Sequence, residues 1–232
     1  MSKLLFQVKK ALGNQHLYGL INNAGTGFEH KVSDKDIIDT NFYGPKRVCD
    51  NFIKLLDPTA GRIVNIGSNG GPEFVSTITD LTVKKQVREE INLQFEGVLD
   101  IVILYSQMCS ASTSWAELEV LMERFLGGDD FGGGTCYDLS KAGLMVYTMQ
   151  LAAQYPNLKV SCVNPGFIST NMSKGYGATK LPDEGTLSTM KCLFEELPGN
   201  GFFYECDGLR SPLNKLRKLD EPEYDGKPPV FD

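Results

Sequence analysis

The chain has 232 residues, of which 41% are hydrophobic, so it can bury one substantial core. Its net charge is −6, from 29 acidic and 23 basic residues, and it contains no basic block that could neutralise a run of phosphates. These values argue against a nucleic-acid partner and predict one globular domain spanning residues 1–232.

Residues 1–14 are charged and lack the long apolar stretch of a secretion signal or a membrane span. We therefore expect a cytoplasmic protein without a membrane partner. The six cysteines lie far apart and form no Cys-x-x-Cys pair, so they are predicted to be reduced packing residues and no metal site is expected.

The first half of the chain predicts a helix, a strand and a second helix. Apolar residues recur at helical spacing from Leu4 to Leu12, and the apolar run Leu17–Ile21 follows as a strand. Ser33 and Asp36 have the spacing of a helix start, and the apolar stripe that follows them predicts one long helix ending before Pro58.

Three later apolar runs predict further strands. They are Arg62–Ile66, Lys159–Val163 and Gly201–Glu205, and a helical pattern from Tyr137 to about Tyr155 precedes the second of them. Strands that alternate with helices indicate a doubly wound α/β fold, in which helices cover both faces of a parallel sheet. Ligands of such folds bind at the carboxyl ends of the strands.

This alternation is interrupted between Gly70 and Gly134. Apolar residues at four-residue spacing over 83–95 and the stretch 115–126 indicate that residues 70–134 form a helical insertion. The glycines of 127–134 lack the preceding strand and the Lys-Ser/Thr of a phosphate loop, so they predict a flexible hinge. After Leu209 the chain is charged and rich in proline, and we expect it to be draped over the surface or disordered.

Tyr137 and Lys141 lie four residues apart, on one face of the predicted helix. A tyrosine has a pKa of about 10, and a neighbouring ammonium group favours the phenolate and lowers this value. The pair could therefore exchange a proton with a substrate near neutral pH. The same spacing also occurs by chance on many solvated helices.

Four further motifs surround this pair in order. Asn22-Asn23-Ala24-Gly25 ends the first strand, Asn41 lies in the following helix, Ser68 follows the second strand, and Asn164-Pro165-Gly166 leaves the third. Together these motifs resemble the short-chain dehydrogenase/reductase family over nearly the whole chain. The long interval between Ser68 and Tyr137 is similar to that of the carbonyl-reductase-like subgroup, in which a helical insertion lies beside the substrate cleft and favours monomers.

The resemblance implies a Rossmann-like fold and NAD(P)H-dependent reduction of a small-molecule ketone or aldehyde. Tyr137 would give its proton to the carbonyl oxygen, and Lys141 would lower the pKa of Tyr137 and hold the nicotinamide ribose. Ser68 would hydrogen-bond the same oxygen, and Asn41 would anchor a water that links Lys141 to solvent.

The resemblance also implies cofactor-binding residues and NADPH in preference to NADH. Besides Tyr137 and Lys141, these residues are Asn23, Ala24 and Gly25 on the adenosine side and Pro165, Gly166, Ile168 and Thr170 around the nicotinamide and its phosphate. Taken singly, several have simpler interpretations: Ser68 as a turn residue, Asn41 as a surface amide and Pro165-Gly166 as a plain turn.

The glycine-rich turn that holds the cofactor pyrophosphate in this family is not found before Asn22. We therefore expect an N-terminally truncated version of the fold, with the strand Leu17–Asn22 at an exposed sheet edge. Two hypotheses follow. The chain is a carbonyl reductase, or it is a catalytically silent fragment that binds a partner or a second copy through this edge.

Overall fold

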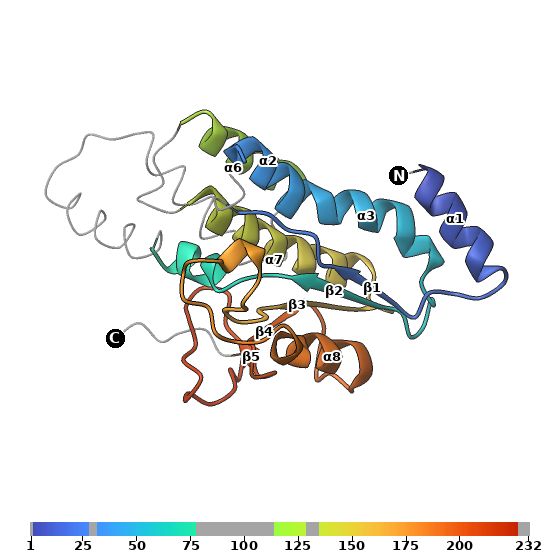
Figure 1. Ribbon diagram of the computed structural model, residues 1–232. Helices are drawn as coiled ribbons and strands as arrows, with labels where there is room; N and C mark the ends of the chain where they lie inside the picture. Colours follow the sequence, from blue (N-terminus) through green and yellow to red (C-terminus); the bar gives the residue numbers. More distant parts are fainter. Residues whose placement is uncertain (1, 28–31, 78–113, 129–134, 227–232) are drawn as a thin grey trace, which may run out of the picture.

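The computed structural model describes residues 2–27, 32–77, 114–128 and 135–226. They form a five-stranded sheet in the order β1-β2-β3-β4-β5, with helices on both of its faces (Figure 1). The strands are β1 (Gly19–Asn22), β2 (Arg62–Ile66), β3 (Lys159–Val163), β4 (Phe202–Tyr204) and β5 (Arg210–Ser211). The first four are parallel and β5 is antiparallel to β4. The predicted doubly wound α/β fold is confirmed.

The strands in the middle of the sheet are its most buried part. Ile63 and Val64 of β2 and Val160 of β3 have no exposed surface, as expected for parallel strands that are covered on both faces. At the edge of the described sheet, β1 pairs only with β2, and Ile21 is 44% exposed. The expected edge position of this strand is therefore confirmed among the described residues.

Helix α1 (Ser2–Leu12) precedes β1. A continuous helical segment comes after β1. This segment comprises α2 (Asp34–Ile38), a π-helical stretch η2 (Asp39–Tyr43), α3 (Gly44–Phe52) and the 3₁₀ turn η3 (Ile53–Leu55). Ser33 caps α2 in a capping box with Asp36, as predicted. One regular helix was expected, but Pro45 has no N–H to donate to the carbonyl of Asn41 four residues earlier, and this accounts for the wider π turn.

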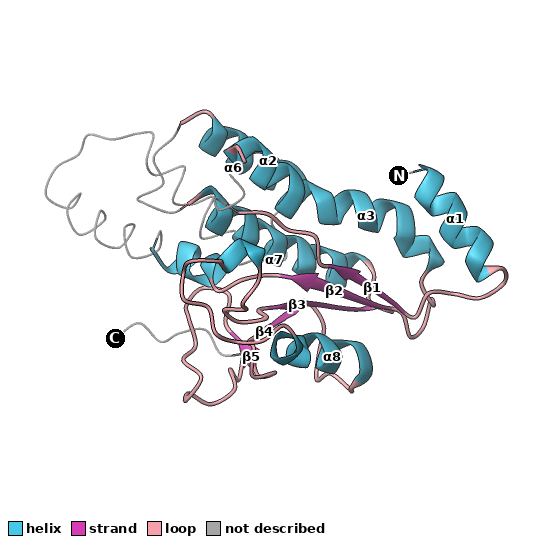
Figure 2. Ribbon diagram, viewed as in Figure 1, coloured by secondary structure: helices cyan, strands magenta, loops and turns pink. Residues whose placement is uncertain are grey.

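The two faces of the sheet are covered by different helices (Figure 2). Helix α7 (Cys136–Gln154) lies on one face beneath α2, α3 and α6 (Trp115–Leu126), and α8 (Leu187–Phe194) covers the other face, after the 3₁₀ turns η4 (Asn171–Ser173) and η5 (Asp183–Thr186). Gly143 allows the close packing around α7. A Cβ at this position would lie 2.4 Å from the Cε of Met122 and 2.9 Å from the ring of Phe42.

The expected insertion is described only in part. Residues 70–77 are helical, and α6 confirms the helix predicted for 115–126. Gly127 caps the end of α6 and Gly128 follows it with a φ of +94°, a conformation that glycine adopts readily. The helical pattern predicted over 83–95 and the glycines of 132–134 lie outside the described residues.

The segment after Leu209 differs in part from the expectation. Arg210 and Ser211 form β5, which pairs with β4, so the tail adds a strand to the sheet. Arg217 is 5% exposed and its Nη2 lies 2.5 Å from the Oδ2 of Asp207. The prediction of a draped or disordered tail is wrong for Arg210 and Ser211, because pairing with the outer edge of β4 orders them. Residues 212–226 form no helix or strand and are mostly exposed, as expected for a draped segment.

The described cysteines are unpaired, and all but Cys206 are buried, as predicted. No helix in the described ranges combines the length and the apolar character that a membrane crossing requires.

Candidate active site

Four side chains that were predicted to be catalytic come from three separate parts of the fold. Ser68 lies just beyond the carboxyl end of β2, Tyr137 and Lys141 occupy the first two turns of α7, and Asn41 lies in the π-helical stretch. Thr135 caps α7 in a capping box with Asp138, which fixes the turn that carries Tyr137.

The side chain of Ser68 lies near enough to Tyr137 to affect its pKa. Burial raises the pKa of Tyr137 above its usual value, the hydroxyl of Ser68 lowers it, and the carboxylate of Asp138 raises it further. The hydroxyl of Ser68 also accepts a hydrogen bond from the backbone N–H of Gly70 at 3.2 Å. Ser68 and Tyr137 are thus neighbours beyond the carboxyl end of β2.

Lys141 is only 5% exposed, and its Nζ donates to the carbonyl oxygen of Ile66 at 2.9 Å. The same Nζ lies 5.5 Å from the ring centroid of Tyr137. Burial lowers the pKa of Lys141 to about 8. Lys141 was expected to lower the pKa of Tyr137, but Lys141 is not among the groups that shift it, and desolvation of the phenol raises the pKa.

Asn41 is 1% exposed, so its interpretation as a surface amide is wrong. Its Oδ1 accepts from the N–H of Thr26 at 2.8 Å, and its Nδ2 donates to the carbonyl of Thr26 at 2.9 Å and to the Oγ of Ser140 at 3.1 Å. The amide thereby ties the segment that follows β1 to helix α7. Thr26 and Ser140 were not among the predicted residues.

The predicted residues after β1 differ in their relation to this group. Gly25 lies next to it: a Cβ there would be 3.5 Å from the Oδ1 of Asn41 and 3.7 Å from the Nζ of Lys141. Asn23 and Ala24 are exposed to solvent. Asn22 has a structural role, because its buried Nδ2 donates to the Oδ1 of Asn65 at 2.7 Å.

The predicted residues Pro165, Gly166, Ile168 and Thr170 lie in the turn that leaves β3, the strand next to β2. Gly166 has a φ of +86° and its N–H donates to the Oδ1 of Asn164 at 3.1 Å. Ile168 forms an isolated bridge with Lys180, and the N–H of Thr170 donates to the Oγ of Ser173 at 2.9 Å. The turn is thus held by its own hydrogen bonds.

A buried carboxylate, which the sequence reasoning missed, joins this turn to the one beside Ser68. Glu205 is 1% exposed, and its Oε2 accepts from the Nδ2 of Asn164 at 2.8 Å and from the N–H of Cys206 at 3.3 Å. The amide of Asn69 faces the same carboxylate, with its nitrogen toward the Oε1 of Glu205 and its oxygen 3.1 Å from the Nδ2 of Asn164.

Burial raises the pKa of Glu205, and the hydrogen bonds from Asn164 and Cys206, together with the charge of Arg217, oppose that effect. Each of Asn69, Asn164 and Glu205 follows closely after an apolar strand in the sequence. Because the ends of neighbouring parallel strands meet, this common position is the signal that could have revealed the network.

The sequence is similar to several known proteins. A family model described as short chain dehydrogenase matches residues 1–79. The chain is 28% identical to salutaridine reductase from Papaver bracteatum over 179 residues, which are 75% of this chain and 52% of that protein. It is also 28% identical to carbonyl reductase (NADPH) 1 from Homo sapiens over 187 residues, covering 72% of this chain and 58% of that protein.

The fold is similar to a solved structure of salutaridine reductase from Papaver somniferum, with a TM-score of 0.66 and 23% sequence identity. That similarity covers 88% of this chain and 77% of the solved one. The chain spans between half and three fifths of the length of these two curated relatives. In its sequence motifs the chain is similar to the short-chain dehydrogenase/reductase family and to its carbonyl-reductase-like members, and its fold is that of the solved salutaridine reductase.

Proposed function

We propose that this chain carries the catalytic part of an NADPH-dependent carbonyl reductase, which reduces a ketone or an aldehyde of small molecular size. The observation that supports this most strongly is that the buried amine of Lys141 lies 5.5 Å from the ring centroid of Tyr137, with Ser68 near the phenol. A hydroxyl pair beside a buried amine, at the carboxyl ends of parallel strands, is suited to binding and protonating a carbonyl oxygen.

Tyr137 acts as the proton donor in this proposal. Its raised pKa keeps the phenol protonated at neutral pH, which is the form needed for reduction. Ser68 donates a hydrogen bond to the substrate oxygen and stabilises the negative charge that develops there. The cofactor, when bound, supplies the hydride.

The residues around Lys141 fit the nicotinamide ribose. The ammonium group carries three N–H donors, and the described hydrogen bond to Ile66 uses one of them. Gly25 lies against the same Nζ without a side chain of its own, which leaves room for sugar hydroxyls. Asn23, Ala24 and Gly25 hold the adenosine side, and Pro165, Gly166, Ile168 and Thr170 hold the nicotinamide and its phosphate. The name of the human relative favours NADPH over NADH.

Asn41 has a positioning role in this scheme. Its Nδ2 spends both hydrogens on Thr26 and Ser140, so a water that links Lys141 to solvent would contact the backbone carbonyl of Asn41. Pro45 supports this arrangement, because it cannot donate the usual helical hydrogen bond to that carbonyl.

The test is a titration of the purified chain with NADPH, followed by NADPH oxidation in the presence of a series of ketones, quinones and aldehydes. Replacement of Tyr137 by Phe should lower the rate by about 100-fold or more while thermal unfolding and NADPH binding change little. Ser68→Ala is the variant for comparison, because it removes the hydroxyl that is proposed to donate to the substrate oxygen and keeps Tyr137. Failure of the folded chain to bind NADPH or to turn over any carbonyl would refute the proposal.

The exposed edge of β1 favours a second candidate, a catalytically silent interaction module. The outer edge of β1 has no partner strand among the described residues, and Ile21 is 44% exposed on it. An open edge of this kind can pair with a strand of another chain. In this case sedimentation should show self-association or partner binding that Ile21→Lys abolishes, and NADPH turnover should be absent.

A further inference from the structure

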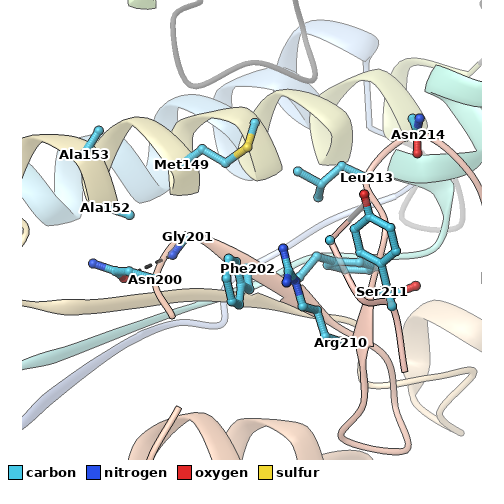
Figure 3. A pocket seen from close by; sticks show the side chains of 13 residues that line it. Met149, Ala152, Ala153, Asn200, Gly201, Phe202, Arg210, Ser211, Leu213 and Asn214 are labelled. Carbon is cyan, nitrogen blue, oxygen red and sulfur yellow. Dashed lines mark hydrogen bonds between the residues drawn. The ribbon is translucent and has the colours of Figure 1, made fainter. Parts of the chain in front are cut away.

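A cleft with a volume of about 570 Å³ lies between the second half of α7 and the strands β4 and β5 (Figure 3). Met149, Ala152 and Ala153 of α7 form one wall, and Phe202 and Leu213 form the other. Met149 lies twelve positions after Tyr137 in α7, which is about 18 Å along the helix axis. The cleft is therefore distinct from the candidate active site.

One cationic side chain reaches into this cleft. The guanidinium carbon of Arg210 lies 3.5 Å from the ring centroid of Phe202, beside which Figure 3 shows it, and 5.2 Å from that of Tyr224. In the described part of the chain, no carboxylate forms an ion pair with this guanidinium; Glu223 accepts only from the backbone N–H of Arg210, at 2.9 Å. None of the described residues that line the cleft is acidic.

A buried hydroxyl group beside Arg210 has no partner. Ser211 also lines the cleft, is 3% exposed, and its Oγ makes no hydrogen bond within the described residues. An unsatisfied buried hydroxyl costs about 1–3 kcal/mol, and an acceptor atom on a ligand could recover part of that cost after a small rotation of the side chain. The cleft thus combines apolar walls, one cation and one free donor.

We propose that this cleft is a second binding site, for a carboxylate attached to a flat apolar body. Its volume falls in the range of about 300–1,000 Å³ that is typical of small-molecule sites. A guanidinium group that packs on an aromatic ring can still present N–H groups to a carboxylate, which it can bind through two parallel hydrogen bonds. The apolar body then packs against Met149, Ala152 and Leu213. This site does not depend on the proposed reductase function.

The experiment is calorimetric titration of the full chain with 2-naphthoate and with its neutral counterpart 2-naphthalenemethanol. Naphthoate should bind saturably at one site, and the alcohol should bind at least about tenfold more weakly, because it lacks the charge-assisted hydrogen bonds to Arg210. Arg210→Met should weaken naphthoate binding by a similar factor. Ala153→Phe, at an exposed helix position, should block the cleft without unfolding the chain.

Two further variants separate binding in this cleft from binding in the candidate active site. Ser211→Ala should weaken naphthoate binding while thermal stability stays equal or rises, because the substitution removes an unsatisfied hydroxyl. Tyr137→Phe should leave naphthoate binding unchanged. Equal affinity for acid and alcohol, unchanged binding in Arg210→Met or Ala153→Phe, or loss of binding in Tyr137→Phe would each overturn the proposal.

Discussion

Helices α7 and α1 are both rich in apolar residues, but they differ in burial. In α7 every residue from 139 to 148 is buried, whereas no residue of 3–12 in α1 is buried, and Leu4 and Phe6 are 51% and 68% exposed. Helix α7 lies between the sheet and a layer formed by α2, η2 and α6, and α1 packs under no such layer (Figure 1). An apolar stripe predicts a helix in both cases, but its contribution to stability depends on what covers it.

The same substitution should therefore have its largest effect in α7. Leu139 has no exposed surface and packs in the cluster that contains Phe42, Leu118 and Leu121. Leu139→Ala should lower the free energy of unfolding by about 2–5 kcal/mol, because it removes buried methyl groups and leaves a cavity. Urea denaturation followed by circular dichroism measures this loss. A change below about 1 kcal/mol would contradict the close packing of this cluster.

The buried carboxylate network should give the next largest effect. Glu205→Ala leaves the amides of Asn69 and Asn164 without their acceptor and should destabilise the chain by about 1–3 kcal/mol. Glu205→Gln keeps one acceptor oxygen and lets the amide of Asn69 rotate, so its loss should be smaller. Urea denaturation of the two variants at pH 7 measures the difference, and equal losses would show that the hydrogen bonds of this network do not matter.

Lys141 should make stability depend on pH in a defined direction. Its pKa is lowered to about 8, so between pH 8 and its unfolded value the unfolded chain binds more protons. The stability of the wild type relative to Lys141→Met should therefore rise with pH over this window, by up to about 1 kcal/mol per pH unit. Denaturation of both proteins from pH 7 to 9.5 measures this slope. The buried cysteines are present in both proteins, so their titration cancels in the difference. A flat or falling difference would show that Lys141 stays charged in the fold.

The smallest effect is expected in α1. Leu4→Ala deletes the same atoms as Leu139→Ala, but from a side chain that is already half exposed. The free energy of unfolding should change by less than about 0.5 kcal/mol. A loss similar to that of Leu139→Ala would mean that α1 is covered in solution, for example by a second copy of the chain, and sedimentation at several concentrations would then identify the association.

Much of the fold follows from local patterns. The residues predicted for the second and third strands are the ones observed in β2 and β3, because strands buried on both faces are continuous apolar runs. The π-helical stretch was missed although Pro45 is visible in the sequence, since a proline bends, widens or ends a helix depending on its surroundings. The strand β5 was missed because two residues carry no periodicity, and the exposed edge of β4 orders them.

The candidate site, like the fold, was predictable from the sequence only in part. The sequence by itself determined which side chains are present and their order along the chain, and parallel strands then bring the ends of β2 and β3 together. Only the tertiary structure decided the electrostatics. Burial raises the pKa of Tyr137 and that of Glu205 and lowers the pKa of Lys141, because desolvation depends on every layer packed around a group and no spacing of residues encodes it.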